Sequence, residues 1–276
     1  ACGIEGSIGP AGDADFYALG APDPGSRLFA MVDGVAANST DFDLRVTTAA
    51  DTLEYDDLSN DTAFGGMAPN VAGTRATGAA CFLRVSHYSS TGQAEPYRLY
   101  GAVQPPEASA TPEIEPNDTI DGATGGSNLY FAGALFDASD ADLFAFSAEA
   151  GDLVFLGLDL DPWRDNTPFN GSLALLDSSG AALLTVNDGS STSSNGSGAG
   201  SLSATTPNSP AEAIAYRMRV TGTYYARVAW SSGTPGDYLL SISYNCRVGT
   251  FLDTDADGVP DAGDCAPNDP AAWAVP

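Results

Sequence analysis

Apolar residues fall in short, strand-length runs along this chain, many of them at alternate positions, and turn-forming residues bound the runs. The main runs fall at 28–32, 42–46, 82–85 and 97–100, and again at 153–156, 173–175, 225–228 and 238–240. A period of two predicts half-buried β-strands, and the Gly, Pro, Asn and Asp residues between the runs predict turns. No long stretch has helical periodicity, so the pattern predicts an all-β protein whose antiparallel sheets pack face to face.

The order of the runs indicates a duplicated unit. Asp13-Ala-Asp15 introduces the first series, and Asp140-Ala-Asp142 introduces the second. Alternating apolar residues follow each Asp pair, at 17 and 19 and at 144 and 146, and add a fifth run to each series. Because five runs and one Asp pair recur in the same order, duplication is favoured over chance similarity. The predicted organisation has a first unit, a Pro-rich linker, a second unit and a separate acidic tail, at 1–104, 105–112, 113–247 and 248–276.

Four motifs of the second unit resemble a known family. They are Glu113-x-Glu-Pro-Asn-Asp-Thr, Asp140-x-Asp-x-Phe-x-Phe, Gly222-x-Tyr-x-x-x-Val and Gly236-Asp-Tyr-x-Leu. They are similar to motifs of the bacterial pre-peptidase C-terminal domain, a family that includes the collagen-binding domains of clostridial collagenases. The resemblance is looser in the first unit. It implies two tandem jelly-roll-like antiparallel β-sandwiches, of a kind usually appended to secreted hydrolases and not themselves catalytic.

The resemblance also implies a calcium site in the second unit. In the collagen-binding relatives an acidic entrance segment and an Asp-x-Asp loop cooperate around calcium. The matching positions here are Glu113, Glu115, Asn117, Asp118, Asp140 and Asp142. From the residues alone an alternative stays open, in which Pro-Asn-Asp-Thr is a simple turn and Asp140 bonds its own backbone. The first unit lacks the entrance, so a turn is expected at Asp13 and Asp15.

The acidic tail has the spacing of a calcium loop. Oxygen ligands at positions 1, 3 and 5, a Gly at 6, a backbone carbonyl at 7 and carboxylates at 9 and 12 follow that pattern. The predicted ligands are Asp253, Asp255, Asp257, Val259, Asp261 and Asp264. Because a Cys follows directly, the segment resembles a thrombospondin type 3 repeat, which implies a short calcium-binding C-terminal tail. The alternative is a solvated acidic linker.

The net charge of −26 narrows the choice of partners. All ten basic residues are Arg, and a surface this acidic repels nucleic acid and anionic lipid. No run of 18 apolar residues occurs, so membrane insertion is not expected. Divalent cations would neutralise clustered carboxylates, and Ca²⁺ is the predicted cofactor.

The four cysteines predict two disulfides in an exported protein. They are Cys2, Cys81, Cys246 and Cys265. The sequence contains no Cys-x-x-Cys pair of the kind that binds a metal ion. Four cysteines can form two disulfides in three ways. The favoured scheme joins Cys2 to Cys81 and Cys246 to Cys265. The predicted location is secreted or extracellular, at a bacterial cell surface.

Catalysis is not favoured by the residue inventory. There is a single His, His87, with no Gly-x-Ser-x-Gly elbow, no His pair for zinc and no Lys. Paired carboxylates keep a hydrolase as a third interpretation. The predicted function is a non-catalytic calcium-binding protein for extracellular adhesion or assembly, with copies of itself as partner in a polymer, filament or surface layer. The alternative is a module that binds collagen, another matrix polymer or a polysaccharide, appended to a secreted hydrolase.

Overall fold

A computed structural model describes most of the chain. The described residues are 4–34, 42–56, 69–87, 89, 96–164, 169–187 and 211–244. Within these ranges the regular structure consists of β-strands and one short 3₁₀ helix, which confirms the all-β prediction. No helix in the described part is long and apolar enough to cross a membrane. The predicted calcium tail at 248–276 lies outside the described residues.

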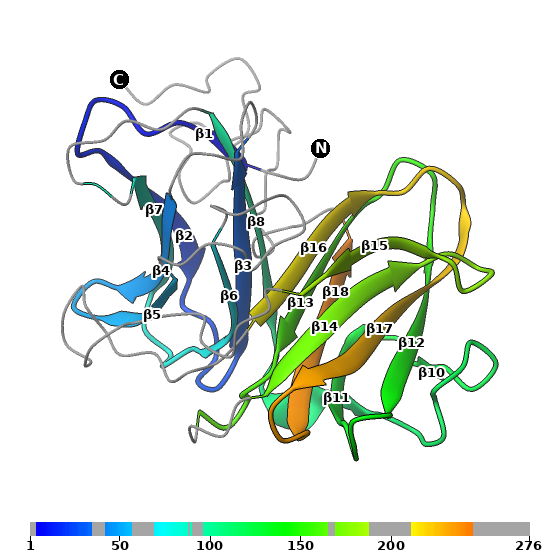
Figure 1. Cartoon of the computed structure of the whole chain (residues 1–276). Coiled ribbons are helices and arrows are strands. Elements are labelled where there is room, and N and C mark those ends of the chain that lie inside the picture. Colours follow the sequence, from blue (N-terminus) through cyan, green and yellow to red (C-terminus); the bar gives the residue numbers. More distant parts are fainter. Residues whose placement is uncertain are drawn as a thin grey trace.

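The first unit contains two four-stranded sheets (Figure 1). Its strands are β1 (Ile4–Gly6), β2 (Ala14–Gly20), β3 (Arg27–Gly34), β4 (Phe42–Thr48), β5 (Thr52–Asp56), β6 (Asn70–Arg75), β7 (Cys81–His87) and β8 (Tyr97–Gln104). One sheet has the order β1-β8-β3-β6 and the other β2-β7-β4-β5. Leu28, Ala30 and Val32 of β3 point into the core between them, where they meet Leu44 and Val85.

The second unit contains two five-stranded sheets. Its elements are η1 (Glu107–Ser109), β9 (Thr111–Pro112), β10 (Thr124–Gly125), β11 (Tyr130–Ala134), β12 (Ala141–Ala148), β13 (Leu153–Asp159), β14 (Asn170–Leu176), β15 (Ala182–Val186), β16 (Ala211–Arg217), β17 (Gly222–Ser232) and β18 (Asp237–Tyr244). The sheet orders are β16-β13-β18-β11-β9 and β10-β12-β17-β14-β15. These sheets enclose a second core.

Strand order and register repeat between the two units. The order β1-β8-β3-β6 recurs as β11-β18-β13-β16, and β2-β7-β4-β5 recurs as β12-β17-β14-β15. Asp15 pairs with Val85 in the first unit, and Asp142 pairs with Val228 in the second. The second unit adds two short parallel strands, β9 and β10, at one edge of each sheet. Both lie in or next to the acidic entrance segment that the first unit lacks.

The two sandwiches pack against each other through one sheet of each, which gives four layers of strands (Figure 1). Phe29, Met31 and Tyr100 of the first unit form one buried cluster with Tyr130 and Phe155 of the second. Strands β3 and β13 are therefore covered on both faces. Burial on both faces explains why their sequences are continuous apolar runs instead of alternating ones.

A buried ion network joins the units beside this apolar contact. Arg27 is 1% exposed; its guanidinium donates to the Glu107 carboxylate and, at 3.0 Å, to the carbonyl of Pro162. Arg164 bonds Asp159 at 2.7 Å and reaches Glu54 in the first unit at 3.2 Å. Glu107 belongs to the segment 105–112, which was expected to be a stiff linker. In the structure this segment holds η1 and β9 and takes part in the junction.

Candidate metal centre

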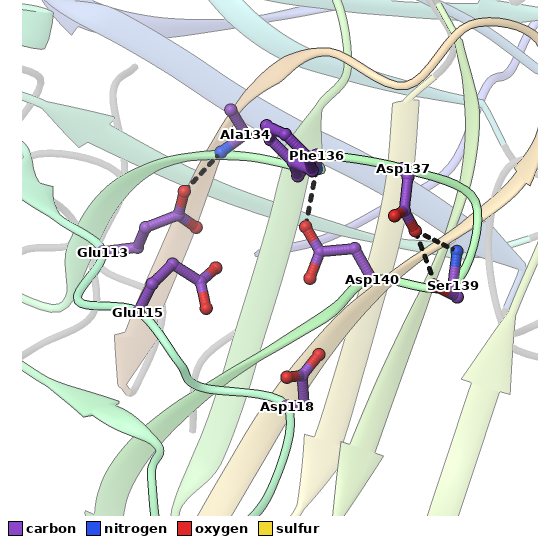
Figure 2. Close-up of a pocket in the computed structure, with 8 residues that line it drawn as sticks. All are labelled: Glu113, Glu115, Asp118, Ala134, Phe136, Asp137, Ser139 and Asp140. Carbon is purple, nitrogen blue, oxygen red and sulfur yellow. Dashed lines mark hydrogen bonds between the residues drawn. The ribbon is translucent and has the colours of Figure 1, made fainter.

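The candidate centre lies where the acidic entrance segment meets β11 and β12. Strand β9 runs parallel to β11, with Pro112 opposite Ala132. This pairing carries Glu113 to the end of β11, where its carboxylate accepts a 2.8 Å hydrogen bond from the backbone N–H of Ala134. Figure 2 shows this bond and the neighbouring acidic side chains. The entrance segment is thus held by strand pairing at the site.

Three carboxylates converge at this point. Glu113, Glu115 and Asp142 each offer an oxygen, and these oxygens all lie within 4.8 Å of one another. Asp118 and Asp140 line an open cavity together with Glu113 and Glu115, and this cavity has a volume of about 630 Å³. In Figure 2 the carboxylates of Glu115, Asp118 and Asp140 face one open space. The structure therefore brings the acidic residues at or before Asp118 together with Asp140 and Asp142, which lie at least 22 positions later in the chain.

Asp142 is the buried member of the cluster. Its side chain is fully buried, and its Oδ2 accepts a hydrogen bond from the hydroxyl of Tyr238. Its Oδ1 has no hydrogen-bond partner among the described residues. Burial, together with the nearby charges of Glu113 and Asp140, raises the pKa of Asp142 to about 8. Such a carboxylate is costly to ionise unless a positive charge comes close.

Glu113 shares this environment. Burial raises the pKa of the Glu113 carboxyl, although the Ala134 N–H lowers it in part. The Tyr238 hydroxyl lies 3.1 Å from Oε2 of Glu113. The same hydroxyl therefore contacts the carboxylates of both Glu113 and Asp142. The hydroxyl has a single proton, which it can donate to only one of the two carboxylates at a time.

Asn117 anchors the entrance segment beneath the cluster. It is fully buried, and its side-chain amide donates to the hydroxyl of Thr124 in β10 at 3.3 Å. Its backbone carbonyl accepts from the N–H of Leu143 in β12 at 3.1 Å, and its backbone N–H donates to Glu115 at 3.0 Å. Its side-chain oxygen has no partner in the described part of the chain.

Asp140 also stabilises a local turn. Its Oδ2 accepts a 2.6 Å hydrogen bond from the backbone N–H of Phe136, as the turn interpretation predicted. The second carboxylate oxygen remains on the cavity side in Figure 2. The turn role and a place in the cavity lining therefore coexist.

In the first unit the residues equivalent to Asp140 and Asp142 are Asp13 and Asp15, and they have different neighbours. Asp13 accepts a 3.2 Å hydrogen bond from the N–H of Gly9, which is the expected turn. Asp15 accepts a 2.5 Å bond from Tyr97, and Tyr97 lies 2.7 Å from the hydroxyl of Tyr17. Register places Tyr17 where Phe144 stands in the second unit. In the first unit the hydroxyl of Tyr17 therefore lies beside the Tyr–Asp pair, whereas in the second unit further carboxylates surround that pair.

Several predicted site residues lie outside the described ranges. They are Asp253, Asp255, Asp257, Val259, Asp261 and Asp264, with Cys2, Cys246 and Cys265. Cys81 is buried at the start of β7. Tyr238 was not predicted as a site residue. Its signal was present in the Gly236-Asp-Tyr motif, which places a tyrosine at the start of a strand beside the Asp-x-Asp loop.

The fold and the cluster together describe a β-sandwich protein with an oxygen-rich candidate cation centre. No family model matches the chain, and no curated protein matches it in sequence. Among solved structures, the pre-peptidase C-terminal domain of a Bacillus anthracis collagenase is 16% identical, with a TM-score of 0.30, over 47% of this chain and 99% of that domain. The exported protein XepA of PBSX is 12% identical, with a TM-score of 0.28, over 87% and 86% of the two chains.

A tandem carbohydrate-binding structure is also similar. The CBM22-1–CBM22-2 pair of Paenibacillus barcinonensis Xyn10C is 13% identical, with a TM-score of 0.25, over 87% of this chain and 86% of that one. At TM-scores this low, none of these similarities decides a function.

Proposed function

We propose that this protein is a non-catalytic, calcium-binding β-sandwich protein that acts outside the bacterial cell in adhesion or assembly. One observation carries the calcium part. The buried Asp142 has an oxygen without a described hydrogen-bond partner, and one oxygen of its carboxylate lies within 4.8 Å of oxygens from Glu113 and Glu115. A cation between these oxygens would offset the cost of burying the charge.

The donor set favours calcium over other metals. Every candidate ligand is an oxygen, whereas zinc prefers nitrogen and sulfur. Calcium accepts six to eight oxygens in flexible geometry, and two oxygens each about 2.4 Å from one ion are at most about 4.8 Å apart. The observed limit of 4.8 Å for Glu113, Glu115 and Asp142 satisfies this condition. Asp140, which lines the adjacent cavity, and the carboxamide oxygen of the buried Asn117 are further candidate oxygen donors.

The proposed role of the ion is structural. Glu113 and Glu115 belong to the entrance segment between β9 and β10, whereas Asp142 belongs to β12. An ion shared by them would fasten the entrance segment to the sandwich and would hold β9 and β10 at the sheet edges. The tail at 248–276 is proposed as a second calcium site on its sequence spacing alone.

A polymer-binding module is the second candidate, and one exposed side chain favours it. Trp163 is 53% exposed, and its indole N–H donates to Asp237 at 2.8 Å. Exposed tryptophans of fixed orientation are common in binding surfaces. A matrix polymer or polysaccharide ligand belongs to this candidate.

Thermal unfolding with calcium and with chelator tests the proposed metal centre. We expect calcium to raise the Tm of the full chain, and we expect Asp142→Asn to reduce this increase. Glu149→Gln, which changes an exposed carboxylate in a turn beyond the far end of β12, is the matched control. A calcium-dependent increase that is equal in wild type and Asp142→Asn would exclude this cluster as the site.

A further inference from the structure

A second cavity lies beside the candidate metal centre. Its volume is about 310 Å³, and it opens where the ends of β9 and β11, the start of β18 and the turn at 161–164 meet. The side chains that matter for its chemistry are Glu107, Pro112, Glu113, Pro162, Trp163 and Asp237. We refer to this cavity as the Trp163 groove.

Trp163 is presented in a fixed orientation. More than half of its side chain is exposed, yet its indole N–H is held by the Asp237 carboxylate at 2.8 Å. Burying a large aromatic ring normally stabilises a protein, so an exposed ring that is held in place points to an external contact.

The turn that carries Trp163 is fixed from both units. The carbonyl of Pro162 accepts hydrogen bonds from Arg27 at 3.0 Å and from Arg75 at 3.1 Å. Arg164, the next residue in the chain after Trp163, donates hydrogen bonds to the Asp159 carboxylate and to the carbonyl of Ala72. Because the turn is already rigid, little conformational entropy is lost when a ligand binds to it.

The polar side chains that line the groove are mainly hydrogen-bond acceptors. Glu113 and Asp237 contribute carboxylates, and no basic side chain is among the residues that line the groove. Two arginines lie nearby. Arg27 is 1% exposed and its guanidinium is engaged by Glu107, whereas Arg75 is 48% exposed and donates to the carbonyl of Pro162 at 3.1 Å. The Tyr238 hydroxyl is engaged by Glu113 and Asp142. The indole N–H of Trp163 is engaged by Asp237. A complementary ligand therefore supplies mainly donors, as the guanidinium of Arg and the ammonium of Lys do.

We propose that the Trp163 groove binds an Arg or Lys side chain from a basic segment of a protein partner. The cation lies over the indole face, and its N–H groups donate to the carboxylate of Asp237. The interaction combines a cation–π contact with charge-assisted hydrogen bonds. The proposal rests on the second candidate function, a binding module that uses Trp163, and it specifies the chemistry of the ligand. It favours a basic protein over a saccharide, because sugar hydroxyls need donors as well as acceptors.

NMR on the full chain labelled with nitrogen-15 tests the groove directly. The chain contains three tryptophans, and the indole signal that disappears in Trp163→Phe identifies the one in the groove. A short uncharged peptide with one central arginine is the probe, and the same peptide with citrulline is the control. We expect the arginine peptide to shift the Trp163 signal, and we expect Trp163→Ala to weaken its binding about three- to five-fold. Added salt weakens it further.

Three outcomes would overturn the proposal. The first is equal binding of the arginine and citrulline peptides, and the second is unchanged binding by Trp163→Ala. The third is Trp163-dependent binding of a neutral oligosaccharide with no response to arginine, which would assign the groove to a polysaccharide. Leu183→Ala, at another exposed apolar side chain on β15, controls for general surface effects. Peptide binding by Asp142→Asn separates the two proposals, because a protein that loses calcium yet still binds the peptide contradicts neither.

Discussion

The hydroxyl of Tyr238 donates a hydrogen bond to the buried carboxylate of Asp142. The same relationship joins Tyr97 to Asp15 in the first unit, at 2.5 Å. Close packing keeps each tyrosine in place, because a Cβ atom added to Gly133 would lie 2.3 Å from the Tyr238 hydroxyl and one added to Gly6 would lie 2.5 Å from that of Tyr97. The duplicated fold therefore repeats one Tyr–Asp pair, and the second unit surrounds its copy with further carboxylates.

Tyr238→Phe and Tyr97→Phe form a matched pair of variants. Each removes a hydroxyl donor from a buried or half-buried aspartate, and we expect each to lower the free energy of unfolding by about 1–3 kcal/mol in chelator. With calcium, the loss for Tyr238→Phe becomes smaller, because the cation compensates Asp142. Denaturant unfolding in both conditions measures the two losses. An equal response of the two variants to calcium would contradict the assignment of the metal to the second unit.

The raised pKa of Asp142 predicts a pH dependence with a definite sign. Its pKa of about 8 lies above that of an unfolded aspartate, so its contribution to stability without calcium is present at low pH and is lost as pH rises through about 8. Calcium must displace this proton, so apparent calcium affinity falls as pH decreases below about 8. Calorimetric titration at several pH values measures the slope. Asp142→Asn is the control and should show a flatter profile.

Two glycines test the contact between the units. Gly20 and Gly73 have φ of +70° and +73°, but a Cβ atom at Gly20 has open space whereas one at Gly73 would lie 1.8 Å from the Asp159 carboxylate. Gly20→Ala should cost about 1–2 kcal/mol of unfolding free energy from backbone strain alone. Gly73→Ala should cost a further 1–3 kcal/mol, roughly, from the steric overlap. Equal costs in urea denaturation would show that the junction does not hold Asp159 against β6.

Arg27 and Arg98 separate a buried ion pair from an exposed one. Arg27 is 1% exposed, whereas Arg98 pairs with Glu5 at 3.0 Å and both side chains are well exposed. Arg27→Leu should lower the free energy of unfolding by about 3–5 kcal/mol, because buried carboxylates lose their counter-charge. Arg98→Leu should cost about 0–1 kcal/mol. A small effect of Arg27→Leu would mean that the junction network does not contribute to stability.

Much of the fold was predictable because the strands follow local rules. Alternation located β4, β7 and β8, and the repeated order of runs anticipated the repeated sheets. The run at 28–32 was predicted as an ordinary strand, yet each of its side chains is buried. A continuous apolar run indicates that both faces of the strand are buried. The local sequence does not show which part of the protein packs on the second face. The stacking of the sandwiches therefore could not be derived from the sequence.

The site was predictable only in part, for a similar reason. The family resemblance grouped Glu113, Glu115 and Asp142, which the structure places together. Tyr238 belongs to one of the family motifs but was not predicted as a site residue, because its contact with Asp142 spans 96 positions. Glu107 lies in a Pro-rich segment whose composition is typical of a linker, and its partner Arg27 is 80 positions away. Ion pairs of this kind depend on tertiary packing that local composition does not encode.

Counting bound calcium per chain tests the central claim most directly. Wild type and Asp142→Asn are equilibrated with calcium, passed over a desalting column and measured by elemental analysis, and Asp255→Asn with Asp257→Asn serves as a separate variant for the tail. We predict that Asp142→Asn retains one calcium ion fewer per chain than wild type, whatever the tail variant retains. An equal calcium content in wild type and Asp142→Asn would contradict the account.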